Sequence, residues 1–112
     1  MTDPTQSAGI KHDAGKARAA MVLGDFARAL EAVAQVGTFG AQKYSAHNWL
    51  AVPCGIERYS DAMLRHWLAE GRGEPRDRDS GLLHAAHLAW NALARLELLL
   101  RQQQAAQDGK AS

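Results

Sequence analysis

Apolar residues recur through the first half of the chain as they do on the buried face of an α-helix. The series begins near Ala20 and comprises Met21, Phe26, Leu30, Val33 and Val36. Gly37 and Gly40 follow it, and Gly37 stands where glycine commonly ends a helix. The pattern therefore predicts one helix that stops at these glycines.

The middle of the chain has a weak pattern followed by a strong one. Residues 41–56 alternate polar and aromatic side chains around a proline and a glycine, which favours an ordered loop or a short helix. Residues 57–70 again place apolar side chains on one face, and two glycines close that segment. Pro75 then favours a connector over residues 73–79.

The last predicted helix runs from about Gly81 to Gln104 and is rich in leucine and alanine, which are strong helix formers. Asp79 or Ser80 is expected to cap it by accepting free amide hydrogens of its first turn. Apolar residues almost encircle this helix, which leaves more apolar surface than one small domain can cover. Because no segment shows a strand pattern, we expect an all-α bundle of three or four helices. We also expect it to form a homodimer or homotetramer.

A length of 112 residues suits one domain with a single modest core. We expect that domain over residues 10–104, with flexible polar ends at 1–9 and 105–112. The formal net charge of +1 argues against a protein that binds nucleic acid polymers. The single cysteine excludes an intramolecular disulfide. Without a secretion signal or a membrane-spanning run, a cytoplasmic protein of a bacterial host or phage-infected cell is expected.

Charges are unevenly distributed along the chain. Lysines such as Lys16 and Lys43 lie early. Four carboxylates lie later: Glu70, Glu74, Asp77 and Asp79. This asymmetry suits a ligand that carries both negative charge and a metal, although a solvated surface can produce the same asymmetry.

Histidine and acidic side chains recur at helical spacing around the connector. His66 precedes Glu70 by one helical turn, so both could bind one cation. Glu74 and Asp77 have the spacing that places two carboxylates on one side of a helical turn. Mg²⁺ and Mn²⁺ prefer such oxygen ligands. The alternative is an ordinary pair of surface charges.

His84 and His87 are also one turn apart, at the start of the last helix. A zinc site would need two further ligands, and Cys54 is distant in sequence. Each histidine could therefore be a metal ligand or could pack in the core. Arg65 follows Asp61 by four residues, which is equally typical of a ladder of surface ion pairs.

Residues 39–49, FGAQKYSAHNW, combine a cation, aromatic rings and an amide in one loop. Aromatic rings stack on bases, amides bind base edges and lysine neutralises phosphate. Lys43, Tyr44, Asn48 and Trp49 are therefore candidate nucleotide contacts. Tyr44 and Trp49 could instead fill the interior of the helix bundle.

Together, the stretches KHDAGKAR, FGAQKYSAHNW, RHWLAEGRGEPRD and SGLLHAAH resemble the dATP/dGTP diphosphohydrolases. These are a MazG-like family of all-α nucleotide pyrophosphohydrolases from phages and bacteria. The similarity extends over about residues 10–100. It implies hydrolysis of purine deoxynucleoside triphosphates to monophosphate and pyrophosphate, with Mg²⁺ or Mn²⁺ as cofactor.

The resemblance also implies roles for individual residues. The expected metal ligands are Glu74, Asp77, Asp79, Glu70, His66, His84 and His87. The expected substrate contacts are Lys43, Tyr44, Asn48, Trp49 and Lys16. Glu74, Asp77 and Arg65 are expected to act in catalysis, with Arg65 offsetting the charge of the triphosphate. Carboxylates would hold the cation, which binds phosphate oxygens while water attacks phosphorus.

The chain departs from the MazG pattern in one respect. MazG-type enzymes carry ExxE on one helix and ExxD on the next, whereas this sequence has only Glu74-x-x-Asp77. A second hypothesis is therefore a non-catalytic protein on the same scaffold, which sequesters a nucleotide or a cyclic nucleotide immune signal. A third hypothesis, a helical assembly module, would leave the loop at 39–49 and the acidic segment unexplained.

Overall fold

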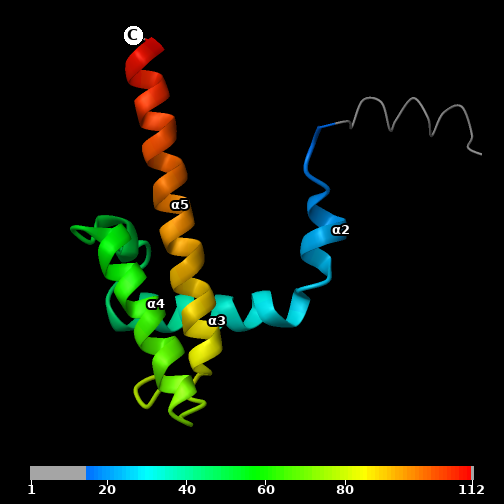
Figure 1. Ribbon diagram of the computed structural model, residues 1–112, viewed down its shortest axis with the longest axis vertical. Helices are drawn as coiled ribbons and strands as arrows, with labels where there is room; N and C mark the ends of the chain where they lie inside the picture. The colour runs from blue at the N-terminus through cyan, green and yellow to red at the C-terminus, as the bar shows by residue number, and fades with distance from the viewer. Residues whose placement is uncertain (1–14, 112) are drawn as a thin grey trace, which may run out of the picture.

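The computed structural model describes residues 15–111, and their fold is all-α as the sequence predicts (Figure 1). The elements are α2 (Ala19–Gly24), α3 (Ala27–Lys43), the 3₁₀ turn η1 (Asn48–Ala51), α4 (Gly55–Gly71) and α5 (His84–Ala111). A single isolated bridge pairs Arg76 with Leu83, and the described residues contain no strand. Within this range no helix has the length and apolar character needed to cross a membrane.

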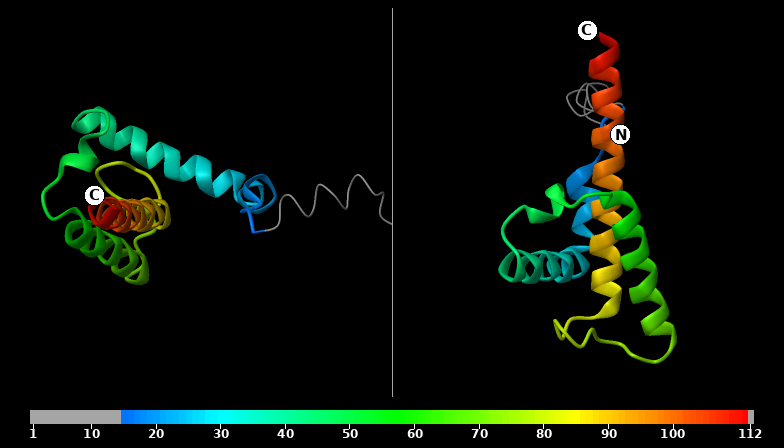
Figure 2. Two further views of the ribbon diagram at one scale, coloured as in Figure 1. Left: turned by 90° about the horizontal axis from the view of Figure 1, so that it is seen from above. Right: turned by 90° about the vertical axis from the view of Figure 1, so that its left-hand side faces the viewer.

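Helices α4 and α5 run antiparallel and form the most extensive helix contact in the molecule (Figure 1). Seen from above, α5 lies between α4 and α3, and α3 crosses α5 at a steep angle (Figure 2). Helix α2 stands apart from the α4–α5 pair in Figure 1 and in the left view of Figure 2. The connector between α4 and α5 closes the pair at one end.

The prediction of a single first helix that stops at Gly37 and Gly40 is wrong in two respects. It is interrupted at Asp25 and Phe26, because Phe26 leaves helical geometry at φ −107° and ψ 26°. It also continues through Gly37 to Lys43. A Cβ atom at Gly37 would lie 3.1 Å from Trp90 Nε1, so glycine here allows α3 to approach the indole of α5. Packing against Trp90 therefore explains this glycine better than helix termination does.

Three aromatic rings join η1, α4 and α5. Trp49, Tyr59 and Trp90 contact one another edge to face, with centroids 5.6–6.2 Å apart. The Tyr59 hydroxyl donates a hydrogen bond to the Trp49 carbonyl at 2.6 Å. This aromatic cluster of Trp49, Tyr59 and Trp90 fixes the short segment between α3 and α4, which the sequence predicted as an ordered loop or short helix.

The last two helices follow the sequence pattern with shifted ends. Helix α4 contains the predicted residues 57–70, whereas α5 begins at His84 and continues past Gln104 to Ala111. The predicted cap is not formed as expected. The Ser80 hydroxyl accepts the Leu82 N–H at 3.1 Å, before α5 begins, and Asp79 pairs with Lys43.

Little apolar surface is buried among the described residues. The buried apolar side chains are Val36, Ala69, Ala86 and Ala94. Large apolar side chains are exposed on every helix, including Leu23, Phe26, Leu30, Trp67, Leu96 and Leu100. The radius of gyration is 18.5 Å, against about 13 Å for a globular domain of similar length. The single chain is therefore extended and presents wide apolar faces.

Candidate functional site

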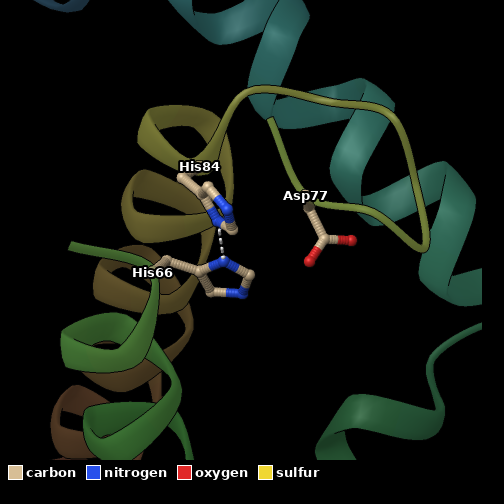
Figure 3. Close-up of side chains that lie close together, drawn as sticks. All are labelled: His66, Asp77 and His84. Atoms are coloured by element: carbon tan, nitrogen blue, oxygen red, sulfur yellow. Dashed lines mark hydrogen bonds between the residues drawn. The ribbon is translucent and has the colours of Figure 1, made fainter. Parts of the chain in front are cut away.

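The end of the α4–α5 pair gathers three histidines and two acids into one cluster, and Figure 3 shows its three inner members. His66 comes from the last turns of α4, whereas His84 and His87 come from the first turn of α5. Asp77 lies on the connector, across from the His66 and His84 rings. We call His66, Asp77, His84 and His87, together with Glu74, the histidine–acid cluster.

The connector folds back on itself, which places its acids beside the histidines. The Asp77 N–H donates to the Leu82 carbonyl at 2.8 Å, and the His84 N–H donates to the Pro75 carbonyl at 2.9 Å. Gly73 and Gly81 bound this reversal with φ values of 92° and 73°. Side chains other than glycine rarely adopt such angles, so these two glycines permit the fold of the connector.

The three inner members converge closely. The Nδ1 atoms of His66 and His84 are 2.8 Å apart. Each of His66, Asp77 and His84 offers one ligand atom, and these three atoms all lie within 4.8 Å of one another. The His87 ring stacks on His66 with centroids 4.5 Å apart and planes inclined by 10°. The cluster therefore combines imidazole nitrogens with a carboxylate in one small volume.

Ser80 belongs to the same site, although the sequence indicated it only as a helix cap. Its hydroxyl lies 2.7 Å from His87 Nε2, and its N–H donates to Asp77 Oδ2 at 2.9 Å. Asp77 Oδ2 is itself 3.9 Å from His87 Nε2. Ser80 thus orients one acid and one histidine, and its position in SGLLHAAH is the signal that could have indicated this role.

His84 contains a buried nitrogen without a hydrogen-bond partner. The His84 side chain is 6% exposed, and its Nε2 atom lies 3.4 Å from Glu74 Oε2. That separation is too long for a well-formed hydrogen bond, and among the described residues no other group satisfies the atom. A buried polar atom in this state is costly to the folded protein.

Burial keeps the other two histidines neutral. Burial, together with the neighbouring His87 and His84 rings, lowers the pKa of His66 to about 4. Burial also lowers the pKa of His87, against the opposing effect of Asp77. Both imidazoles are therefore uncharged at neutral pH, and each has a nitrogen lone pair available.

Acid should destabilise the metal-free protein through His66. Its pKa is about 4 in the folded chain against an ordinary 6.5, so the unfolded chain takes up the proton first as the pH falls. The stability conferred by the neutral ring is complete above about pH 6.5 and is lost progressively towards about pH 4. If His66 were fully buried, the free energy of unfolding would fall by about 3 kcal/mol over this range of pH. Partial exposure of the ring reduces that loss to about 1–2 kcal/mol.

Urea unfolding with a chelator at a series of pH values measures this effect. His66→Asn should flatten the dependence between about pH 6.5 and pH 4. His47→Asn is the matched control, because His47 is exposed and lies outside the cluster in a left-handed conformation that asparagine tolerates. An unchanged slope in His66→Asn would contradict the assignment to His66.

The two acids of the cluster are held in the charged form. Burial would raise the pKa of Asp77, but hydrogen bonds from the N–H and hydroxyl of Ser80 outweigh it, and the pKa lies below its ordinary value. The hydrogen bond from Arg78, at 2.8 Å, lowers the pKa of Glu74. Both carboxylates are therefore ionised beside neutral histidines.

Lys43 connects the loop at residues 39–49 to the connector. Its ammonium group pairs with Asp79 and lies 5.6 Å from the Tyr44 ring centroid. The hydrogen bond and charge of Asp79 raise the pKa of Lys43. Asp79 and Lys43 are both exposed, so this pair lies at the surface. The Lys43–Asp79 pair joins the loop at residues 39–49, which the sequence indicated as a substrate contact, to the connector, which carries expected acids.

Other expected site residues lie outside the histidine–acid cluster. The exposed ones are Lys16, Tyr44, Asn48, Arg65 and Glu70. Lys16 precedes α2, and Trp49 belongs to the aromatic cluster. Among the described residues, the group that could hold a metal consists of His66, Asp77 and His84, and it includes neither Glu70 nor Asp79.

The chemistry of the donor set fits a divalent cation. Two imidazoles and an ionised carboxylate supply donor atoms at one point, and Glu74 and His87 stand beside them. The unpartnered nitrogen of His84 is a second sign of a bound group, because protein contacts alone leave this buried atom unsatisfied.

Comparisons with known proteins support the resemblance seen in the sequence. The family described as "dATP/dGTP diphosphohydrolase, N-terminal" matches residues 6–108. A protein of Salmonella phage PMBT28 named "dATP/dGTP diphosphohydrolase" is 42% identical over 81 residues, which are 72% of this chain and 26% of the phage protein. The chain therefore spans about a quarter of the length of that relative. No solved structure matches this chain. Since the family match covers nearly all of the sequence, the chain belongs to the N-terminal dATP/dGTP diphosphohydrolase family.

Proposed function

We propose that the protein hydrolyses dATP or dGTP to the monophosphate and pyrophosphate with a divalent cation, Mg²⁺ or Mn²⁺. The convergence of His66, Asp77 and His84 at the end of the α4–α5 pair is the observation that carries this proposal. Family membership and the name of the phage relative support the choice of substrate. We place this activity in the cytoplasm of a bacterial host or phage-infected cell.

The surface around the cluster carries the positive charge that a triphosphate needs. Lys43 pairs with Asp79, and a phosphate oxygen could replace that exposed carboxylate as its partner. Arg78 is 93% exposed at its side chain and pairs with Glu74 on the connector. Arg65 is exposed on α4, directly before His66. These three cations could offset charge on the α, β and γ phosphates.

The reaction transfers the α phosphoryl group to water. The oxygen of water bonds to α phosphorus, and the bond to the α–β bridging oxygen breaks, so pyrophosphate leaves. A bound divalent cation supplies charge neutralisation at the phosphate oxygens. Asp77 and the histidines would hold this cation in place. His87, which is neutral and lies near Asp77, could accept the proton released from water.

Incubation of the chain with each of the eight common dNTPs and NTPs tests the function. Products are separated by chromatography after reactions with Mn²⁺, with Mg²⁺ and with chelator. Monophosphate and pyrophosphate in equal amounts, from dATP or dGTP and only with metal, are the expected result. Release of orthophosphate alone, or no turnover of any nucleotide with either metal, would overturn the proposal.

A second function is a nucleotide-binding protein without turnover. The observation that favours it is the donor set itself, which contains one close carboxylate and lacks the ExxE pair of MazG-type enzymes. Such a protein would sequester a purine nucleotide or a cyclic nucleotide signal. Binding measured by calorimetry in the absence of any product would favour this function over hydrolysis.

We propose that the chain assembles with a second copy of itself through α2 and α3. Helix α2 has six residues and none of them is buried. An isolated helix of that length is unstable in water, so it needs a packing partner. Leu23, Phe26 and Leu30 expose 51%, 54% and 38% of their surfaces along these two helices. A second copy would cover this apolar face.

Light scattering after size exclusion should give a mass of two or four chains of 12.1 kDa. Phe26→Asp combined with Leu30→Asp should shift the protein to the monomer mass, because each charge would be buried in the interface. Leu64→Asp, on the exposed face of α4, is the matched control and should keep the wild-type mass. A wild-type monomer at micromolar concentration would contradict the assembly.

A further inference from the structure

The two closest donor atoms in the histidine–acid cluster are both Nδ1 atoms. His66 Nδ1 and His84 Nδ1 lie 2.8 Å apart, so as a direct hydrogen bond one of them must carry the proton. Two nitrogens bound to one metal at about 2.1 Å lie about 3.0 Å apart at octahedral angles and about 3.4 Å apart at tetrahedral angles. A small opening of this contact therefore accommodates an ion between the rings.

The outer nitrogen of His84 supports the same arrangement. Its Nε2 atom is buried, lacks a hydrogen-bond partner and lies 3.4 Å from Glu74 Oε2. If Nδ1 binds a metal, the proton must reside on Nε2, where it points to this carboxylate. Histidine ligands of metals commonly donate their second N–H to a carboxylate in this way. The unsatisfied atom and the nearby Glu74 are then explained together.

Asp77 supplies the third donor from the opposite side. The Ser80 N–H holds one of its oxygens at 2.9 Å, and Figure 3 shows its carboxylate facing the His66 and His84 rings across the site. His87 stacks on the His66 ring, and its Nε2 atom lies 2.7 Å from the Ser80 hydroxyl. The His66 ring is therefore oriented by a stacking contact that does not involve its Nδ1 atom.

We propose that His66 Nδ1, His84 Nδ1 and an Asp77 oxygen form a site for a first-row transition-metal ion, with Glu74 as the hydrogen-bond partner of His84 rather than a ligand. Two nitrogens and one oxygen suit Mn²⁺, Fe²⁺, Co²⁺, Ni²⁺ or Zn²⁺, whereas Mg²⁺ prefers oxygen ligands alone. Three protein ligands leave further positions for phosphate oxygens. The inference deepens the proposed function, on which it rests for the identity of those outer ligands.

Titration of the full chain with Co²⁺ tests the site without any need for turnover. Visible absorption reports nitrogen ligation, and the thermal unfolding midpoint reports binding to the folded chain. Co²⁺ should give one absorbing site per chain and raise the midpoint, and the same concentration of Mg²⁺ should do neither. Equal effects of Mg²⁺ and Co²⁺ on the midpoint, without an absorption band, would overturn the proposal.

Variants separate a ligand from its partner. His66→Asn removes an imidazole donor and Asp77→Asn removes the negative charge of the carboxylate donor, so each should weaken Co²⁺ binding at least about 100-fold. Glu74→Gln keeps an oxygen that can accept from His84 and should weaken binding only about 10-fold. His47→Asn removes an exposed histidine outside the cluster and should leave binding unchanged. Far-UV circular dichroism confirms that each variant is folded.

The outcomes distinguish this inference from the proposed function. A loss in Glu74→Gln equal to that in His66→Asn would make Glu74 a ligand and overturn the assignment. Hydrolysis of dGTP with Mg²⁺ and no Co²⁺ binding would overturn the metal site and leave the function standing. Co²⁺ binding that depends on His66 and Asp77, without turnover of any nucleotide, would support the metal site and contradict the proposed hydrolysis.

Discussion

Asp77→Asn should lower the rate of dGTP hydrolysis at least about 100-fold. The substitution removes the negative charge that stands opposite the His66 and His84 rings, so it weakens the hold on a cation. It keeps the shape of the side chain and an oxygen that can accept the Ser80 N–H. The fold is therefore preserved, and the loss should appear in turnover. Pyrophosphate release at saturating nucleotide measures it.

Asp108→Asn is the matched control for this experiment. Asp108 lies near the far end of α5, is exposed and accepts a hydrogen bond from Gln104 on the next turn. The same chemical change there should leave turnover unchanged. A rate for Asp77→Asn within about threefold of the wild type would remove the Asp77 carboxylate from the reaction, since an acid that holds charge in the transition state contributes far more.

Trp90→Ala should lower the free energy of unfolding by about 3 kcal/mol. The indole contacts Trp49 and Tyr59 edge to face and fills the space left by Gly37. Its removal leaves a cavity where α3, η1 and α4 meet α5. Urea unfolding followed by circular dichroism measures the change.

Trp67→Ala provides the comparison for the same residue type. Trp67 is 58% exposed on α4, so its truncation should cost at most about 1 kcal/mol. The difference between the two variants isolates packing from the general loss of a large side chain. Equal losses would contradict the view that the aromatic cluster joins α3, α4 and α5.

Periodicity predicted the helical class and the cores of α4 and α5, because apolar spacing determines which face a helix buries. It could not predict the interruption at Asp25 and Phe26, where the apolar spacing continues but the backbone leaves helical geometry. It also misinterpreted Gly37, because local propensity favours a helix end at glycine. The close approach of Trp90, more than fifty positions later in the sequence, explains the glycine at position 37 instead.

The candidate site was predictable as a set of residues but not as an arrangement. His66, Asp77 and His84 were all expected ligands, and the structure brings them together. The expected partner of His66 one turn on, Glu70, is exposed instead. The difference arises in the connector, where backbone hydrogen bonds turn Asp77 back towards α5. Helical spacing carries no information on such a reversal, and the contact of Ser80 with His87 was missed for the same reason.

The antiparallel α4–α5 pair has a consequence for how the protein folds. His66 and His84 are separated by only 18 positions along the chain, and Asp77 lies between them. Closing a loop this short carries a small entropic cost, so the donors meet as soon as the helical hairpin forms. Docking of α3 needs contacts between residues further apart along the chain, so we expect it to follow. A metal ion captured at the hairpin stage would favour native over misassembled chains, and cofactor supply would then influence folding yield as well as activity.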